Sequence, residues 1–380
     1  MRILHVGLPN LPVDSAIGGA VERRMRVLSQ SQARLGHEVI VVTPERGEFS
    51  KIPRVEFSSD VELVRVRCPL GNYLGQIHLT GRAAWLARRR SCDVVHVHNA
   101  VAGGIWARMS ARPLLLSLDF ATYRFDQSLL RTFWAAQIGG FSRLLPVSSS
   151  AAELVRSKWP ALPSEVLFNP VDETRFRPKD GAASSLDEPF HYGYLGRVCE
   201  QKGADILANA FRIVSATLGK EVKLSIAGPA DRFGNIESND YVEDLRRVGA
   251  RVLGAISDTE VPSYLRSLDC LVVPTKRDER FGMVAAEAMA CGTPIVSSGV
   301  GGLTEVVDTA AGINAEPHAD AIAQAMIEMY VLRTQSEGRI DPRASSRRFW
   351  GRTVAEKSII IYESAIGGSH ERDLRHRGHA

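Results

Sequence analysis

Several patterns that mark common protein classes are missing from this chain of 380 residues. It contains no Gly-x-x-x-x-Gly-Lys-Ser/Thr phosphate loop, no Gly-x-Gly-x-x-Gly after the first apolar run, and no Gly-x-Ser-x-Gly elbow. These absences exclude P-loop nucleotidases and α/β-hydrolases, and they argue against a nicotinamide dehydrogenase.

Cysteines are few, and long apolar runs are absent. The five cysteines include no Cys-x-x-Cys pair, which argues against a disulfide framework and against structural zinc. The apolar run within Met1–Leu8 is too short for a signal peptide, and no window reaches the eighteen apolar residues of a spanning helix. We therefore expect a cytoplasmic protein that at most rests on the inner face of a membrane.

The charge is nearly balanced overall but unevenly distributed. The chain carries 47 Lys+Arg against 43 Asp+Glu, a net charge of +4, so charge alone does not predict a nucleic-acid partner, and none is expected. Residues 1–170 hold 21 basic and 13 acidic side chains, whereas residues 171–380 hold 26 and 30. This asymmetry predicts two domains with different partners.

The first part of the chain reads as a parallel α/β domain. Apolar runs at residues 2–8 and 37–44 flank a helical pattern at Val21–Leu35, which together form a βαβ unit. Further strands are expected at residues 93–98, 112–118, 143–148 and 165–168.

A second α/β domain is expected after a linker. Residues 175–189 are rich in Pro, Gly, Ser and charge. Helices are expected at Asp205–Leu218 and Asp258–Ser267, between strands at residues 190–196, 221–228, 250–254, 269–275 and 293–298. The fold class predicted is therefore α/β, with two Rossmann-like, doubly wound domains.

Near the end of the chain, residues 349–366 read as one amphipathic helix. Its apolar side would carry Phe349, Trp350, Val354, Ile359 and Tyr362. Residues 367–380 lack apolar periodicity, and we expect them to be disordered.

Loops that follow strands are the places to look for chemistry in sheets of this kind. Gly18 and Gly19 precede the first helix, so backbone N–H groups are free there for an anion or a sugar. Arg197 and Lys202 follow the first strand of the second domain, and two such cations suit a diphosphate. Each pair alone is also compatible with an ordinary turn or with solvated surface cations.

The segment from Glu279 to Glu287 is the most informative in the chain. Glu279 lies in a loop, Gly282 permits a turn, and Glu287 falls in an alanine-rich helix whose first N–H groups are open to a ligand. Carboxylates bind vicinal hydroxyls and helix N–H groups bind phosphate.

Two further loops carry polar side chains. His96 and His98 end one strand pattern, and in a regular strand we expect only one of them to reach the loop side. Asp119 follows the next strand pattern. No metal-ligand spacing accompanies these residues, and no metal site is predicted.

Taken together, these segments resemble glycosyltransferase family 4, whose members are retaining, nucleotide-sugar-dependent enzymes of the GT-B fold. The resemblance runs from "GGAVERRM" through "DVVHVHN" and "LGRVCEQKG" to "ERFGMVAAEAMACGTPIVSS" and the closing helix. It implies two domains that face a central cleft, with residues 1–172 and the crossing helix 349–366 as the acceptor domain. Residues 173–348 would form the nucleotide-sugar domain.

The resemblance also implies roles for individual residues. Arg197 and Lys202 would bind the donor diphosphate, Glu279 the transferred sugar and Glu287 the ribose. Backbone groups of Phe281, Gly282 and Met283 would complete the cradle, and Gly18 and Gly19 would border the phosphates. Asp119 stands where many members have a histidine; His98 and Arg280 are, with it, the remaining candidates for contacts with sugar or acceptor.

The expected activity is transfer of a hexosyl unit, from a UDP-sugar by preference, to a hydroxyl of a glycan, a lipid-linked acceptor or a small molecule. Front-side attack without a cofactor or an obligatory metal is expected, with a two-carboxylate mechanism as the competitor. A catalytically silent nucleotide-sugar-binding subunit and a sugar-nucleotide epimerase are the alternatives.

Two basic patches bear on a further partner. One comprises Arg23, Arg24 and Arg26 on the first helix, and the other comprises Arg82 and residues 88–90 around Trp85. Both suit either peripheral contact with anionic lipid or a solvated helix face.

Overall fold

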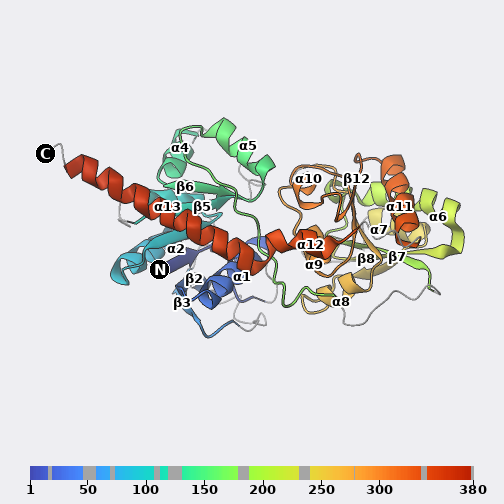
Figure 1. Cartoon of the computed structure of the whole chain (residues 1–380), viewed down its shortest axis with the longest axis horizontal. Helices are drawn as coiled ribbons and strands as arrows, with labels where there is room; N and C mark the ends of the chain where they lie inside the picture. Colours follow the sequence, from blue (N-terminus) through green and yellow to red (C-terminus); the bar gives the residue numbers. More distant parts are fainter. Residues whose placement is uncertain are drawn as a thin grey trace. The chain divides into compact units, whose positions relative to one another are not determined.

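The computed structural model divides the chain into two compact units (Figure 1). Unit 1 comprises Met1–Pro170 and Gly351–Ala380, and unit 2 comprises Val171–Trp350. The residues that the structure describes are 1–15, 19–45, 57–68, 73–106, 112–118, 131–178, 188–230, 240–277, 279–334 and 340–377, with side chains omitted at 131–134 and 368–377. Gly18, Asp119 and the middle of the expected linker lie outside them.

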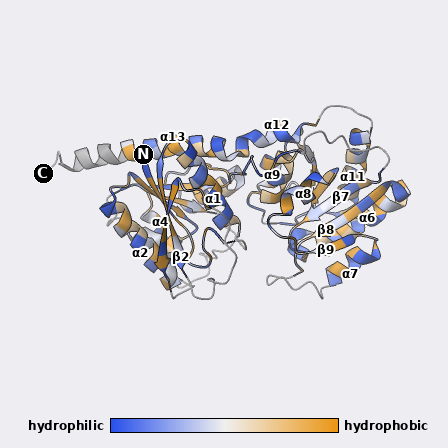
Figure 2. Ribbon diagram, turned by 90° about the horizontal axis from the view of Figure 1, so that it is seen from below, coloured by the Kyte–Doolittle hydropathy of each residue, from blue (hydrophilic) through white to orange (hydrophobic). Residues whose placement is uncertain are grey.

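Unit 1 is built on a parallel sheet of six strands in the order β3-β2-β1-β4-β5-β6. Apolar residues bury both faces of its central strands, which Figure 2 shows as hydrophobic. The strands are β1 (Arg2–Val6), β2 (Glu38–Glu45), β3 (Val61–Arg67), β4 (Val94–His98), β5 (Leu114–Leu118) and β6 (Arg143–Pro146).

Helices cover both faces of this sheet. One buried cluster joins α2 to strands β1, β2, β4 and β5. On the opposite face, a second cluster joins α1 and α13 to β1, β4 and β5, and a third joins α1 to β2 and β3. The helical segments are α1 (Ala20–Arg34), α2 (Tyr73–Arg89), η2 (Val101–Trp106), α4 (Arg131–Gly139), α5 (Ser149–Lys158) and α13 (Gly351–Arg377).

Unit 2 repeats this architecture with the strand order β12-β11-β10-β7-β8-β9. The strands, all parallel, are β7 (Phe190–Leu195), β8 (Val222–Ala227), β9 (Arg251–Gly254), β10 (Cys270–Val273), β11 (Ile295–Ser297) and β12 (Gly312–Asn314).

One face of the unit 2 sheet packs on α6, α7 and α11 in a single buried cluster, and α9 contacts β10 and β11. The helices are α6 (Ala204–Leu218), α7 (Asp240–Arg247), α8 (Val261–Arg266), α9 (Met283–Ala290), α10 (Leu303–Val306), α11 (Ala319–Thr334) and α12 (Pro342–Ser346). Short 3-10 turns are η4 (Glu200–Lys202), η5 (Gly219–Glu221) and η6 (Arg347–Phe349).

Two doubly wound α/β units are therefore confirmed, with three differences among the strands. Residues 165–168 are not a strand; Glu165 and Leu167 hydrogen-bond to β6, but only an isolated bridge at Ser164 forms. β3 and β12 were not expected, because β3 is an edge strand with charged positions and β12 has only three residues.

Helix α13 differs from the expected helix at both ends. It begins at Gly351, so Phe349 and Trp350 belong to unit 2, where Phe349 packs edge-on against Phe281 at 5.2 Å. It continues to Arg377, past the expected end at residue 366 and through most of the expected disordered tail. No helix among the described residues is both long enough and apolar enough to cross a membrane.

A buried polar network fastens α13 to the sheet. Tyr362 on α13 lies 2.6 Å from His96 Nδ1, and Gln32 on α1 donates to Ser358 at 2.8 Å. The far nitrogen of His96 lies 2.5 Å from Ser117 on β5. All five side chains are fully buried, so the network ties four elements, α1, β4, β5 and α13, together inside the core.

Arg24 belongs to this network as well. Its guanidinium donates to Ser117 Oγ at 2.6 Å, and the side chain is only 1% exposed. The expectation of a basic surface patch that includes Arg24 is therefore wrong, because this residue lies on the inward face of α1.

His96 and His98 both point into the network, which corrects the expectation that only one would reach the loop side. Their positions i and i+2 place them on the same face of β4, and their rings stack at 4.1 Å between centroids. His5 Nε2 donates to Gln32 Oε1 at 2.7 Å, so its Nδ1 accepts from His98 Nε2 at 3.0 Å.

The three histidines have ring nitrogens within 4.8 Å of one another, a spacing that a metal ion also requires. Five of the six ring nitrogens already have hydrogen-bond partners, and the cationic Arg24 is hydrogen-bonded to the same Ser117. Burial lowers the pKa of His5 to about 4 and those of His96 and His98 well below their usual value. We therefore assign the trio as neutral hydrogen-bonding groups.

This network predicts that unit 1 loses stability in mild acid. The unfolded chain takes up protons near pH 6.5 and the folded histidines do not, so stability is complete above that pH and falls as the pH approaches about 4. Three such groups give a slope of up to about 4 kcal/mol per pH unit. Urea unfolding at a series of pH values measures it.

The substitution His5→Gln should reduce that slope by about a third, since one of three titrating groups is removed. His78→Gln, at an exposed position on α2, is the matched control and should keep the wild-type slope. An unchanged slope in His5→Gln would contradict the assignment.

Candidate active site

The strand order of unit 2 fixes where a ligand is expected to bind. β7 pairs with β10 on one side and with β8 on the other, so the crossovers depart in opposite directions between β7 and β10. Ligands of open α/β sheets bind in the crevice outside the carboxyl ends of strands at such a point. The loops that follow β7 and β10 carry Arg197, Lys202 and Glu279.

The structure brings Lys202 and Glu279 together. Lys202 Nζ lies 2.6 Å from Glu279 Oε2, and the two side chains are 30% and 16% exposed. Gly203, in the left-handed region at φ +75°, allows the two loops this close approach, because a Cβ there would lie 1.9 Å from the Pro274 carbonyl oxygen. The ion pair is thus half-buried, and the close approach of the two loops holds its partners near each other.

The backbone around Glu279 is supported by a second glycine loop. Gly302 N–H donates to the Glu279 carbonyl at 2.8 Å, and a Cβ on Gly301, at φ +61°, would lie 2.2 Å from that same oxygen. Larger residues at either position would displace the Glu279 loop.

Helix α9 begins directly after this loop. Gly282 is its N-cap at φ +92°, and no side chain caps the first turn. The N–H groups at this end are therefore open toward the loop side, where the helix dipole favours an anion.

Arg197 follows β7 and is half-buried. Tyr194 Oη donates to the Arg197 carbonyl at 2.5 Å, which holds the backbone of this loop. In the described part of the chain the guanidinium makes no ion pair, in contrast to Lys202 and to Lys276, which pairs with Asp205 at 2.8 Å. Arg197 is thus available for a ligand anion.

The remaining expected residues of unit 2 lie at different depths. Glu287 is 1% exposed on α9, and the Phe281 side chain is buried against Phe349, so only its backbone can serve a ligand. Met283 is the first residue of α9, and Arg280 is half-buried beside the Gly302 loop.

Unit 1 has an equivalent edge. β1 pairs with both β2 and β4, so its switch point lies between β1 and β4. His98 ends β4 there, is 1% exposed, and its Nδ1 has no hydrogen-bond partner within the described residues. Gly19 is the N-cap of α1, again without a side-chain cap.

Some supporting residues were not identified from the sequence. Tyr194, Gly203 and the pair Gly301 and Gly302 hold the backbone of the loops that carry Arg197, Lys202 and Glu279. The glycines at residues 299–302 permit a tight loop, but nothing in the sequence indicates that this loop lies against Glu279.

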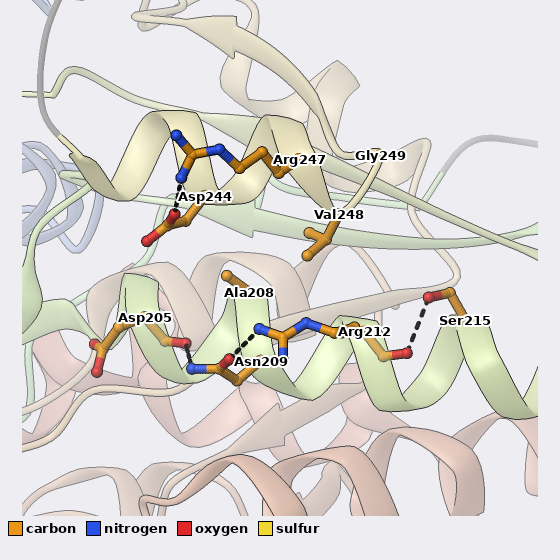
Figure 3. Close-up of a pocket in the computed structure, with 9 residues that line it drawn as sticks. All are labelled: Asp205, Ala208, Asn209, Arg212, Ser215, Asp244, Arg247, Val248 and Gly249. Atoms are coloured by element: carbon orange, nitrogen blue, oxygen red, sulfur yellow. Dashed lines mark hydrogen bonds and ion pairs between the residues drawn. The ribbon is translucent and has the colours of Figure 1, made fainter.

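A separate groove of about 580 Å³ lies between α6 and α7 (Figure 3). Its cations are already engaged, since Arg247 pairs with Asp244 at 2.8 Å and Arg212 donates to Asn209. It does not include the Lys202–Glu279 pair, and we assign it no function.

The charged groups of this site suit a ligand that carries both phosphates and sugar hydroxyls. Two cations and an open helix terminus bind a diphosphate, and carboxylates bind sugar hydroxyls. Comparison with known proteins agrees with this chemistry. Residues 17–175 match the family model described as Glycosyltransferase Family 4, and residues 189–331 match that of Glycosyl transferases group 1.

Among curated relatives, D-inositol 3-phosphate glycosyltransferase 1 of Catenulispora acidiphila is 30% identical, covering 74% of this chain and 74% of that protein. Glycogen synthase of Mycobacterium tuberculosis is 26% identical over 99% of this chain and 97% of its own length.

Among solved structures, sucrose-phosphate synthase from Thermosynechococcus elongatus has a TM-score of 0.73 at 20% identity, covering 97% of this chain and all of the other. Anabaena Alr3699/HepE in complex with UDP has a TM-score of 0.70 at 20% identity, covering 96% of this chain and 100% of its own. The family matches, the relatives and the shared fold lead to one conclusion: this chain belongs to glycosyltransferase family 4 and is a nucleotide-sugar-dependent glycosyltransferase of the GT-B fold.

Proposed function

We propose that this protein is a retaining hexosyltransferase that moves a hexosyl unit from a UDP-sugar to a hydroxyl of a glycan, a lipid-linked acceptor or a small molecule. The observation that carries the proposal is the Lys202–Glu279 ion pair beside the start of α9, whose N-cap is the glycine Gly282, with Arg197 in the neighbouring loop and without an ion pair among the described residues. The solved structures of Anabaena Alr3699/HepE with UDP and with UDP-glucose support the choice of nucleotide.

In this proposal the donor diphosphate binds between the β7 loop and α9. Arg197 holds phosphate oxygens bidentately, Lys202 adds a point charge, and the N–H groups of Gly282 and Met283 donate to the remaining oxygens. Glu287 binds the ribose hydroxyls from α9, and Glu279 binds hydroxyls of the transferred sugar. Lys202 is then shared between Glu279 and the phosphates.

The chemical step separates charge, and the residues match where it develops. As the bond between the anomeric carbon and the diphosphate breaks, negative charge grows on the phosphate near Arg197 and Lys202. The anomeric carbon becomes oxocarbenium-like, and the Glu279 carboxylate stabilises it from the sugar side. With front-side attack the acceptor hydroxyl passes its proton to the leaving phosphate oxygen, and no enzymic nucleophile is needed.

The acceptor is assigned to unit 1. Its switch-point edge carries His98, whose Nδ1 is a buried acceptor without a partner among the described residues. Asp119 and, separately, Arg280 are the other sequence candidates for contacts with sugar or acceptor. We propose a cytoplasmic location for this reaction, because nucleotide sugars are supplied there.

The first experiment is a thermal-shift series with UDP, GDP, ADP and dTDP and their sugar conjugates. We expect UDP and one UDP-sugar to stabilise the protein. Stabilisation by a different nucleotide series would replace UDP in the proposal. No stabilisation by any of them would favour the silent subunit, and UDP-sugar turnover that leaves the sugar on the nucleotide would favour the epimerase.

Glu279→Ala and Arg197→Ala should separate transfer from binding. Glu279→Ala should lower kcat by roughly 100-fold or more while leaving UDP affinity unchanged or slightly improved, because Lys202 is released for phosphate. Arg197→Ala should weaken UDP binding by roughly 10- to 150-fold, since a charge-assisted hydrogen bond is worth about 1.5–3 kcal/mol.

Calorimetry with UDP and an assay of released UDP measure the two effects. Glu243→Ala and Arg212→Ala, at exposed positions of unit 2, are matched controls and should behave as the wild type. Equal loss of UDP binding in Glu279→Ala and Arg197→Ala would contradict the roles assigned to them.

Transfer should also persist when divalent ions are chelated. The cations Arg197 and Lys202 with the α9 terminus supply the positive charge that a divalent ion supplies elsewhere. Assays after exhaustive EDTA treatment should retain most of the activity, and loss that Mg²⁺ or Mn²⁺ restores would overturn the metal-independent mechanism.

A further inference from the structure

One helix of unit 1 presents an unusual outer face. On α2 the exposed side chains Leu74, His78, Arg82, Trp85 and Arg89 follow one another at intervals of three or four residues, so they form one stripe along the helix. Figures 1 and 2 show α2 at the periphery of unit 1. The opposite face of the same helix packs its small apolar residues into the core.

The centre of the stripe is an exposed tryptophan between two arginines. Trp85 is 50% exposed, and the guanidinium groups of Arg82 and Arg89 lie 5.1 and 5.3 Å from its ring centroid. Arg88 is exposed on the next turn, whereas Arg90 pairs with Glu62 at 3.1 Å.

No acidic residue occurs anywhere in α2, and Arg82, Arg88 and Arg89 make no ion pair within the described residues. The surface is therefore cationic and not neutralised from within the described chain. An anionic partner would complete it.

The apolar part of this surface extends onto η2. Ile105 is 49% exposed, and its neighbour Trp106 donates from Nε1 to the Ile77 carbonyl of α2 at 2.9 Å. η2 follows β4 directly, so this part of the surface lies at the carboxyl edge of the sheet. We call Leu74, Arg82, Trp85, Arg88, Arg89 and Ile105 the α2 surface.

We propose that the α2 surface docks unit 1 on an anionic lipid bilayer. Tryptophan is favoured at the headgroup level, where the ring is half in apolar surroundings, and arginine reaches lipid phosphates from the same depth. A bilayer surface offers phosphates on all sides of an inserted ring, so it suits arginines placed on both sides of an exposed Trp. A folded protein partner would have to supply carboxylates at matching positions around that one ring.

The docking is shallow and reversible. The apolar face of α2 is already committed to the core, which leaves only Leu74, Trp85 and Ile105 to enter the headgroup region. Electrostatic attraction then contributes most of the affinity for the bilayer, and each arginine near the anionic surface raises the partition coefficient roughly fivefold. This inference goes beyond the proposed function and does not depend on which sugar is transferred.

Sedimentation with vesicles tests it. The full chain is mixed with vesicles of phosphatidylcholine containing phosphatidylglycerol, and with vesicles of phosphatidylcholine alone, at low and high ionic strength. We expect sedimentation with the anionic vesicles at low salt and much less at high salt, because the Debye length shortens. Failure to sediment with anionic vesicles at low salt overturns the proposal.

The triple variant Arg82→Gln, Arg88→Gln, Arg89→Gln should reduce partitioning by roughly 100-fold, since glutamine keeps helix propensity while the charges are lost. The control triple Arg156→Gln, Arg212→Gln, Arg251→Gln removes the same net charge from exposed positions outside the α2 surface and should partition nearly as the wild type. Equal loss in both triples would show attraction to net charge only and would overturn the proposal.

A second readout reports the position of Trp85 itself. Brominated lipids should quench part of the tryptophan fluorescence of the wild type, and Trp85→Ala should lose that quenching while the other four tryptophans remain. Quenching that persists in Trp85→Ala would contradict docking through α2. UDP should stabilise all these variants against heat as much as it stabilises the wild type. A failure of membrane binding can therefore be distinguished from a failure of the proposed function.

Discussion

The site depends on one topological constraint: in each unit a central parallel strand pairs with neighbours whose crossovers leave in opposite directions. Between β7 and β10 the loops can spread apart from the sheet, which leaves room for a ligand that the other strand pairs do not offer. Between β1 and β4 the same constraint applies, and His98 ends a strand there. Glycines stand where neighbouring loops approach one another, because a Cβ there would clash with the backbone of the other loop.

In the crevice at the carboxyl edge of the unit 2 sheet, only part of the positive charge is neutralised by a neighbouring carboxylate among the described residues. A half-buried lysine is stabilised by Glu279 at 2.6 Å, while the neighbouring arginine stays available. In the function we propose, an incoming diphosphate would compete with the Glu279 carboxylate for one of the two cations. Because the proposal assigns the same carboxylate to the sugar, it implies that nucleotide and sugar binding are coupled through the Lys202 ammonium group.

The sequence predicted the two doubly wound units because buried parallel strands read as apolar runs, and it predicted Lys202 and Glu279 because both follow such runs. It did not predict the edge strand β3 or the three-residue β12, whose patterns are weak. Arg24 was predicted to be exposed because most helical arginines are. Only the packing of α1 against α13 shows that Arg24 is buried and donates a hydrogen bond to Ser117. The contact of Gly301 with Glu279 joins segments from different loops, which no local pattern encodes.

Helix α13 completes a core that β1 begins: Val354, Ile361 and Tyr362 lie in one cluster with Ile3 and Leu28. Unit 2, by contrast, is one continuous segment. During synthesis, Val171–Trp350 therefore has all its residues before unit 1 does, although unit 1 starts the chain. The order of completion on the ribosome is the reverse of the order in the sequence, and the part of the unit 1 sheet that α13 covers stays exposed until the residues from Gly351 onward emerge.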